Sequence, residues 1–361
     1  MNPSSKRILV VKLAAIGDVT LALPFFAALK EEFSQSHVAL LVGKSAAPLA
    51  ENNPAIDQHI VIDENIFWRK RMPGLVSLFW RLKRENFDAV YILHWSRWFH
   101  AFFWFMGIPE RIGFNRNGRS FRLTRAAPYV EGSQDIHETQ QYLRLVHERY
   151  AHDNPAAHAP KLFFSEEEKT GISKWIASLG FPTDRPWIAV SPGGGHNTKL
   201  FMPQKRWPAA HYAGLLKRLL AEEKAYIFLL GDSSEKNLIK PWMDQMPSRD
   251  YCNLAGEISL RRTALLIQRC RLFIGNDSGL LHLAGAVGTP SLSFFGPTSP
   301  NGKLPVWTLH KYLYTREICS PCYKYGQAPP CPYDLKCLRH ITVDEAFREA
   351  HELLGQKEAV G

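Results

Sequence analysis

The sequence predicts an α/β protein with two doubly wound, Rossmann-like domains that face a central cleft. Short apolar runs alternate with amphipathic helical patterns along most of the chain, as expected for parallel sheets covered by helices. The alternation stops once, in the polar, proline-containing stretch 151–168, and then begins again. A length of 361 residues is sufficient for two cores. We therefore expect one domain over residues 1–165 and a second over 170–361.

The expected elements follow in order. Residues 7–13, 37–43 and 88–93 read as buried parallel strands, and 136–150 as an amphipathic helix. In the second half the expected strands are 187–192, 225–231, 271–277 and 291–297, with helices at 208–223, 259–270 and 343–355. The last of these helices could pack back toward the first domain. Ligands of such sheets bind at the carboxyl ends of the strands, so the turns that follow the strands are where function is expected.

The composition limits the class of protein. The net charge of +10 favours an anionic partner. No apolar run reaches the roughly 18 residues of a spanning helix, and the first residues lack an apolar signal region, so we expect a cytoplasmic protein with reduced cysteines. A G-x-G-x-x-G fingerprint is missing after the strands, which disfavours a dinucleotide dehydrogenase.

Two turns of the second half have residues suited to an anion or a sugar. Gly193 and Gly194 belong to a run of three glycines that is followed by Lys199, Lys205 and Arg206. This loop could bind an anion or simply be flexible. In the turn 230–237, Asp232 fits a helix cap, whereas Glu235 could cap the helix or accept hydrogen bonds from a ribose.

The turn after the strand 271–277 is the most informative. Asp277, Ser278 and Gly279 lead into a helix that contains His282. The N–H groups at the start of that helix, together with its dipole, favour a diphosphate, and His282 could add a donor. Asp277 fits either a partner of sugar hydroxyls or an N-cap.

The first strand leads into a turn with an acid. Asp18 follows the single glycine Gly17, and an acid at this position would repel a phosphate. From residue type alone, Asp18 could cap a helix that begins at Val19.

These motifs together resemble glycosyltransferase family 9, the ADP-heptose:lipopolysaccharide heptosyltransferases. The matching pieces are "KLAAIGDVTLALP" (12–24), "RIGF" (111–114), "HETQQYLRL" (137–145), "SPGGG" (191–195), "KRWP" (205–208), "GEISL" (256–260) and "GNDSGLLHLAGAVGTPSLSFFGPTSP" (275–300). The resemblance implies the GT-B fold and an inverting transfer of heptose from ADP-heptose to the inner core of lipopolysaccharide, the oligosaccharide linked to lipid A.

The resemblance also implies roles for individual residues. Asp18 matches the family's catalytic base, which takes a proton from the acceptor hydroxyl. Lys205 would neutralise the leaving diphosphate without a metal, assisted by donors on Ser278, Gly279 and His282. Asp277 would hold the heptose or ribose, and Ile258 would lie near the base. The segment "GGGHNTKLFMPQ" departs from the family pattern, so Lys199 competes with Lys205 for the phosphate role.

Four cysteines lie close together in the sequence. Cys319, Cys322, Cys331 and Cys337 form C-x2-C-x8-C-x5-C. They could bind a structural Zn²⁺ ion or remain free thiols.

A second feature outside the motifs is an arginine-rich, aromatic first half. Residues 67–84 and 95–125 are basic and aromatic, and they include Arg116, Arg119 and Arg122. Most of these aromatic residues could form core, but the excess of arginine suits a phosphorylated glycolipid acceptor at the inner face of the inner membrane. No nucleic-acid-binding motif accompanies the charge.

Other functions on the same fold stay open from the sequence. These are a transferase that uses another nucleotide sugar or a protein acceptor, a nucleotide-sugar epimerase or hydrolase, and a protein that binds a glycolipid or nucleotide without catalysis.

Overall fold

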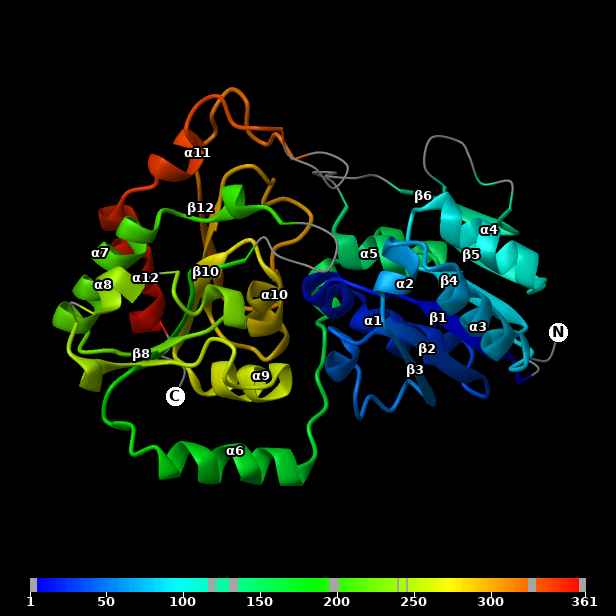
Figure 1. Ribbon diagram of the computed structural model, residues 1–361, viewed down its shortest axis with the longest axis horizontal. Helices are drawn as coiled ribbons and strands as arrows, with labels where there is room; N and C mark the ends of the chain where they lie inside the picture. The colour runs from blue at the N-terminus through cyan, green and yellow to red at the C-terminus, as the bar shows by residue number, and fades with distance from the viewer. Residues whose placement is uncertain are drawn as a thin grey trace. The chain divides into compact units, whose positions relative to one another are not determined.

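The computed structural model describes residues 5–115, 120, 122–129, 136–194, 201–238, 240–244, 246–323 and 329–356. The chain divides into two compact units, Met1–Phe163 and Phe164–Gly361. Over the described residues, each unit contains one six-stranded sheet whose strands are all parallel (Figure 1).

The sheet of the first unit has the strand order β3-β2-β1-β4-β5-β6. The chain runs from β1 to one edge and then returns to the other side of β1, which makes β1 and β4 the point where the strand order reverses. The strands are β1 (Arg7–Val11), β2 (His37–Gly43), β3 (Gln58–Ile62), β4 (Ala89–Ile92), β5 (Glu110–Asn115) and β6 (Arg125–Pro128). The helices are α1 (Ile16–Glu32), α2 (Asn65–Trp68), α3 (Met72–Lys83), α4 (Arg97–Met106) and α5 (Glu138–Leu143).

The second unit repeats this arrangement in the order β12-β11-β10-β7-β8-β9, and the strand order reverses between β7 and β10. Its strands are β7 (Trp187–Ser191), β8 (Tyr226–Leu229), β9 (Tyr251–Asn253), β10 (Leu272–Asn276), β11 (Ser291–Phe295) and β12 (His310–Tyr314). Its helices are α6 (Glu166–Ser178), α7 (Ala209–Glu222), α8 (Lys240–Met243), α9 (Leu260–Arg269), α10 (Gly279–Ala286), α11 (Lys336–Arg339) and α12 (Val343–Gln356).

Each sheet is covered because its central strands are apolar on both faces. In the first unit, Leu9 and Val11 of β1 share a buried cluster with Leu75 and Leu78 of α3 and with Phe103 of α4. Such two-sided burial is why these strands read as continuous apolar runs in the sequence.

The last helix packs within the second unit. The sequence leaves open that α12 packs toward the first domain. Its Phe347, Ala350 and Leu353 lie in the same core cluster as Leu215 and Leu219 of α7.

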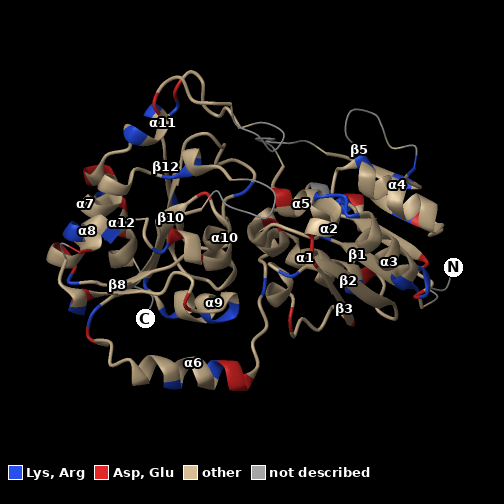
Figure 2. Cartoon of the chain, viewed as in Figure 1, with Lys and Arg blue, Asp and Glu red and all other residues tan. Residues whose placement is uncertain are grey.

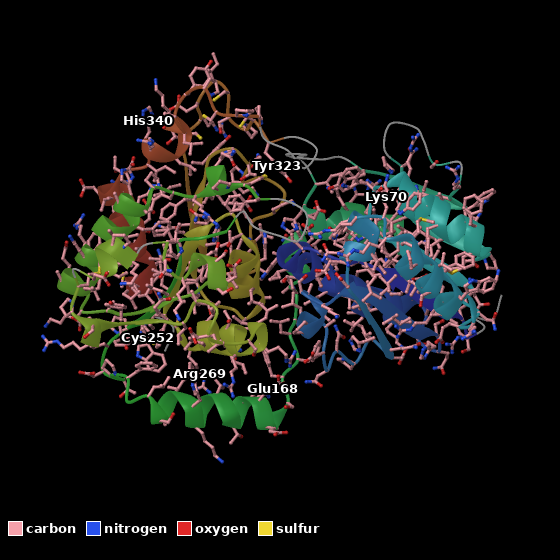
Figure 3. All side chains as sticks on the ribbon, in the orientation of Figure 1. Lys70, Glu168, Cys252, Arg269, Tyr323 and His340 are labelled. Atoms are coloured by element: carbon pink, nitrogen blue, oxygen red, sulfur yellow. The ribbon has the colours of Figure 1, made fainter. Side chains whose placement is uncertain are left out.

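Helix α6 begins at a capping box. Ser165 and Glu168 exchange side-chain and backbone hydrogen bonds, and acidic residues fill the first turn, where they complement the helix dipole (Figure 2). Arg261 of α9 forms an ion pair with Glu168, and Nη2 of Arg269 donates to Oγ of Ser173 at 3.0 Å. Glu168 of α6 and Arg269 of α9 are labelled in Figure 3. These contacts attach α6 to α9.

The predicted helix over 136–150 is correct only for its first part, and its predicted length is wrong. The structure has the short helix α5, followed by a turn and a 3₁₀ turn at Glu148–Ala151. Leu143, Leu145 and Val146 are all buried, so this segment has no continuous solvated face. Nη2 of Arg125 donates to the carbonyls of Leu145 and Val146, which a longer helix would use for its own hydrogen bonds.

A helix with the length and apolarity required to span a membrane does not occur among the described residues.

Candidate functional site

The glycine loop and the start of α10 meet in the second unit, at the point where the strand order reverses. Pro192, Gly193 and Gly194 follow β7, and Asp277 and Ser278 follow the neighbouring strand β10. Open parallel sheets bind ligands at such points.

Asn276, the last residue of β10, holds this region together. Its side chain is fully buried, and its Nδ2 donates to the carbonyls of Pro192 at 3.0 Å and Gly193 at 2.7 Å. Its Oδ1 accepts a hydrogen bond from the backbone N–H of Trp207 at 2.9 Å. One amide therefore fixes the glycine loop and the segment that contains Lys205 relative to β10. No local sequence pattern indicates this role for Asn276.

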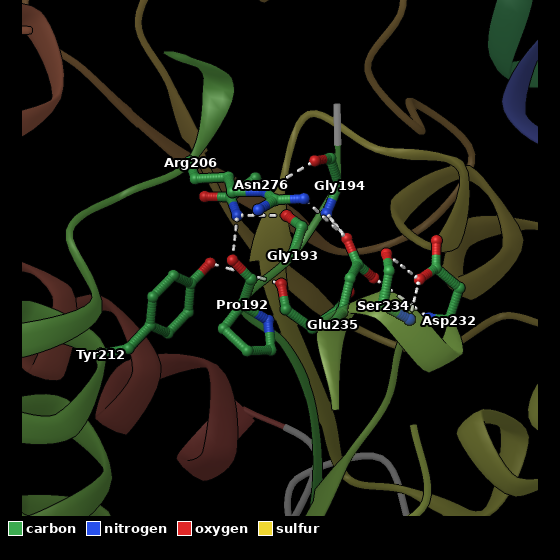
Figure 4. Close-up of polar contacts among 10 residues, drawn as sticks. Pro192, Gly193, Gly194, Arg206, Tyr212, Asp232, Ser234, Glu235 and Asn276 are labelled. Atoms are coloured by element: carbon green, nitrogen blue, oxygen red, sulfur yellow. Dashed lines mark hydrogen bonds and ion pairs between the residues drawn. The ribbon is translucent and has the colours of Figure 1, made fainter. Parts of the chain in front are cut away.

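Glu235 fixes the other side of the loop (Figure 4). Its Oε1 accepts from the N–H of Gly194 at 2.5 Å and lies 3.2 Å from Nη2 of Arg206. Its Oε2 accepts from the N–H of Asp232 at 3.1 Å, within a capping box. Both carboxylate oxygens therefore accept hydrogen bonds from the protein itself. Glu235 lies beside the glycine loop, and its contacts hold that loop in position.

The glycines allow this close packing. A Cβ atom at Gly193 would lie 2.1 Å from the Glu235 carboxylate, and one at Gly194 would lie 2.8 Å from Cβ of Ser278. Gly194 also has a φ of 97°, which favours glycine. The glycine loop is therefore a packed element that lies directly against the start of α10.

Ser278 has an unused hydroxyl at the N-terminus of α10. It is the N-cap residue, but its side chain makes no capping hydrogen bond. Its Oγ is buried, with no hydrogen-bond partner among the residues that the structure describes. A buried hydroxyl without a partner is unfavourable in the free protein, so this atom is available to a ligand. The N–H groups that begin at Gly279 add positive potential.

Lys205 and Asp277 form a largely buried ion pair. Nζ of Lys205 lies 2.6 Å from Oδ2 of Asp277, and the two side chains are 16% and 8% exposed. Burial by itself raises the pKa of Asp277, but Lys205, with His282 and Lys303 also contributing, outweighs it and holds that pKa below its usual range. The Asp277 carboxylate thus lies among three basic side chains, and this excess of basic over acidic groups suits an anionic ligand.

Ile258 lies at the edge of this region, half-buried and one residue before Ser259, the N-cap of α9. Two residues earlier, the N–H of Gly256 donates to the carbonyl of Gly231 at 3.0 Å, so the "GEISL" segment packs against the turn after β8.

Asp18 lies in the first turn of α1. The helix begins at Ile16 and its N-cap is Ala15, so the alternative that Asp18 caps a helix beginning at Val19 is wrong. The Asp18 side chain is 36% exposed, and its Oδ2 lies 3.9 Å from Nζ of Lys12. The turn thus holds a carboxylate that water or a substrate can reach.

A buried polar network lies behind Asp18. Nζ of Lys12 donates to the Tyr142 hydroxyl at 2.8 Å, and that hydroxyl donates to Oε1 of Glu138 at 2.7 Å. Burial, then the charges of Glu138 and Asp18, hold the pKa of Tyr142 well above its usual range, so the phenol stays protonated. None of these three residues is among the predicted site residues, although a lysine in the apolar run "RILVVKL" is a usable signal of a buried charge.

Of the three arginines predicted to bind the acceptor, Arg116 and Arg119 lie outside the described residues. Arg122 is half-buried, and its guanidinium lies 5.7 Å from the centre of the Trp104 ring on α4. Lys199 also lies outside the described residues.

The four clustered cysteines are free thiols. Cys319, Cys331 and Cys337 line a cavity of about 180 Å³ together with Tyr333 and Lys336. Burial, with the neighbouring cysteines contributing, raises the pKa of Cys337 to about 11. Within the described part of the chain, no three His, Cys, Asp or Glu residues are arranged to hold a metal ion, so the geometry gives no support to the candidate zinc site.

Comparison with known proteins places these residues in a family. The model of glycosyltransferase family 9 (heptosyltransferase) matches residues 75–331. The chain is 27% identical to lipopolysaccharide heptosyltransferase 2 of Salmonella typhimurium over 364 residues, which covers 97% of this chain and 99% of that protein.

Solved structures agree on the fold. The structure of E. coli ADP-heptose LPS heptosyltransferase II has a TM-score of 0.77 at 24% identity and covers 98% of this chain and 99% of its own. E. coli heptosyltransferase WaaC with ADP-2-deoxy-2-fluoro heptose has a TM-score of 0.65 at 19% identity and covers 96% and 99%. The two parallel six-stranded sheets are those of the GT-B fold.

Proposed function

This chain belongs to glycosyltransferase family 9, and from that premise we propose that it transfers heptose from ADP-heptose to the inner core of lipopolysaccharide, with inversion at the anomeric carbon. The observation that carries the proposal is the buried Ser278 hydroxyl at the start of α10, which has no hydrogen-bond partner within the described part of the chain. It lies against the glycine loop and beside the basic groups around Asp277. These are the groups that a sugar diphosphate needs.

The donor belongs in the second unit. In this proposal Ser278, Gly279 and His282 donate to the diphosphate, and Lys205, which is paired with Asp277 in the free protein, supplies a positive charge as that group departs. The Asp277 carboxylate lies close enough to Lys205 to orient the lysine side chain. The same carboxylate accepts hydrogen bonds from the hydroxyls of the heptose or ribose. Asn276 and Glu235 act as positioning residues, because their hydrogen bonds are made to the protein itself.

The acceptor belongs in the first unit, with Asp18 as the base. The Asp18 carboxylate takes the proton of the acceptor hydroxyl while the oxygen forms a bond to the anomeric carbon. The bond between that carbon and the diphosphate breaks, and the nucleotide leaves with the electron pair. Nζ of Lys12 lies 3.9 Å from Oδ2 of Asp18, so a positive charge stands beside the proposed base.

The relatives support the choice of substrates. A Salmonella relative is a lipopolysaccharide heptosyltransferase, and a structural relative contains an ADP-heptose analogue. We extend both to this chain, with an anionic glycolipid as the acceptor, at the inner face of the inner membrane. Arg122, together with Arg116 and Arg119, would contact its phosphate groups. No metal is needed in this proposal, because cationic and helix-end groups stabilise the diphosphate.

A donor screen tests the proposal. Purified protein is incubated with ADP-heptose or with UDP-, GDP- and TDP-sugars, with and without heptose-deficient lipopolysaccharide, and the released nucleotide is measured. ADP release that requires both ADP-heptose and the glycolipid is expected. Release from another nucleotide sugar, or equal release without acceptor, would instead support a different transferase or a hydrolase. Transfer of heptose to a protein acceptor in place of the glycolipid would show that the proposed acceptor is wrong.

A further inference from the structure

Helix α3 has two apolar faces. Leu75, Leu78 and Leu82 are buried against the sheet. Met72, Val76 and Trp80 recur at every fourth residue and are 59%, 50% and 57% exposed. A helix on a globular domain ordinarily presents polar residues to solvent, so this second apolar stripe is not explained by the fold.

Helix α4 continues the same surface. Phe99 and Phe103 are buried, whereas Trp98, Trp104 and Phe105 are exposed, Phe105 by 69%. The two helices are neighbours, since the rings of Phe79 on α3 and Phe102 on α4 lie 5.9 Å apart. We call the exposed apolar residues of both helices the α3–α4 surface, namely Met72, Val76, Trp80, Trp98, Trp104 and Phe105.

Positive charge surrounds this surface. Residues 66–84 and 95–109 together contain seven Lys and Arg and no Asp or Glu. All seven are exposed: Arg69, Lys70, Arg71, Arg81, Lys83, Arg84 and Arg97. Nζ of Lys70, a residue labelled in Figure 3, lies 5.7 Å from the centre of the Trp98 ring, so cations and aromatic rings alternate at the contact.

We propose that the α3–α4 surface docks the protein on a bilayer with anionic headgroups. Tryptophan rings are stable at the level of the headgroups, where one side is apolar and the other hydrated. The smaller apolar side chains reach the acyl boundary, and the long basic side chains extend to the lipid phosphates.

A bilayer suits the surface better than a second copy of the chain. In a symmetric dimer the same patch is used by both subunits, so seven cations would face seven cations without acidic residues from these segments. An anionic membrane neutralises the same charges. The inference rests on the proposed function only for its purpose, which is to bring the enzyme to a membrane-embedded acceptor; the surface itself is defined without reference to Asp18 or the donor.

Vesicle co-sedimentation tests the inference, using the whole protein and no glycolipid. The probes are phosphatidylcholine vesicles with about 30% phosphatidylglycerol, and pure phosphatidylcholine vesicles. The wild type should bind the anionic vesicles and release them as salt is raised. Replacement of Arg69, Arg71 and Arg81 by Gln should reduce partitioning by about a hundredfold, since each cation near an anionic surface contributes roughly fivefold.

Matched variants separate docking from general effects of charge or apolarity. Trp80→Ser with Phe105→Ser should reduce partitioning at least about tenfold, because two exposed aromatic side chains are removed from the interface. Lys174→Gln, Arg249→Gln and Arg262→Gln change three exposed cations of the second unit, and Leu179→Ser with Val306→Ser changes two of its exposed apolar side chains. Both control sets should bind like the wild type. Thermal midpoints verify that every variant folds.

Several results would overturn the inference. The first is equal binding of the wild type to neutral and anionic vesicles. The second is a loss of vesicle binding in the control variants as large as that in the variants of the α3–α4 surface. The third is a wild-type dimer that Trp80→Ser with Phe105→Ser converts to a monomer. A soluble, delipidated acceptor distinguishes this failure from failure of the proposed function. Transfer to that acceptor without vesicle binding refutes docking alone, whereas vesicle binding without any transfer refutes the transferase assignment alone.

Discussion

Replacing Lys205 with Met should destabilise the protein through the carboxylate that it leaves behind. The ammonium lies 2.6 Å from Asp277, and the two side chains are only 16% and 8% exposed. Removing one partner of a buried ion pair costs about 3–5 kcal/mol. His282 and Lys303 also act on Asp277, so we expect the lower end, about 3 kcal/mol, in the free energy of unfolding by urea.

A second variant separates this structural effect from donor binding. Lys205→Met combined with Asp277→Asn removes both charges and should recover most of the lost stability. ADP affinity, measured by calorimetry, should remain about 10–100-fold reduced in both variants, the usual effect of losing one charge-assisted hydrogen bond. Lys174→Met, on exposed α6, is the control and should change neither quantity. If the double variant regains wild-type ADP affinity, Lys205 is a structural partner of Asp277 and the diphosphate role is refuted.

Three further predictions follow from the second unit. The hydrogen bond from Arg261 lowers the pKa of Glu168 from 4.5 to about 2, so Glu168→Gln should lower the thermal midpoint at pH 7 by the equivalent of about 1 kcal/mol. The difference in thermal midpoint between wild type and variant should shrink as pH falls from 4.5 toward 2, because Glu168 becomes protonated. A constant difference across this pH range would refute the ion pair as its cause. Asn276→Ala should lower the free energy of unfolding by about 3 kcal/mol, since it removes three hydrogen bonds, and it should also weaken ADP binding. A variant with unchanged ADP affinity would mean that the Asn276 amide does not position the site. Transfer should continue at an unchanged rate in the presence of a chelator, because in the proposed mechanism protein cations and a helix N-terminus stabilise the diphosphate. An absolute requirement for added Mg²⁺ would contradict this mechanism.

The sequence predicts most of the inner strands but misses the inner strand β5 and the edge strands. Strands such as β1 and β10 are buried on both faces, so their residues form continuous apolar runs. The edge strand β9 is half-buried along its whole length, and β12 is half-buried except at the exposed Tyr312, so neither strand forms a continuous apolar run. The helix predicted over 136–150 fails because helical spacing cannot reveal that Arg125 takes the carbonyls of Leu145 and Val146.

In the candidate site, too, some features are predictable from local sequence and others are not. Ser278 and Gly194 follow strands and belong to recognisable turns, so their neighbourhood is predictable from local sequence. The role of Asn276 depends on contacts with Pro192 and Trp207, which are 84 and 69 residues away, and no local pattern encodes them. The pairing of Lys205 with Asp277 likewise emerges only when the chain folds.

Asp18 is proposed to remove the proton of the acceptor hydroxyl, and the variant Asp18→Asn is the sharpest test of this role. The amide keeps the size of the side chain but cannot act as a base, so kcat with ADP-heptose and glycolipid should fall by roughly two to four orders of magnitude. The affinity for ADP should stay at the wild-type value, because the proposed donor groups all lie in the second unit. Turnover near that of the wild type, with ADP binding intact, would contradict the account.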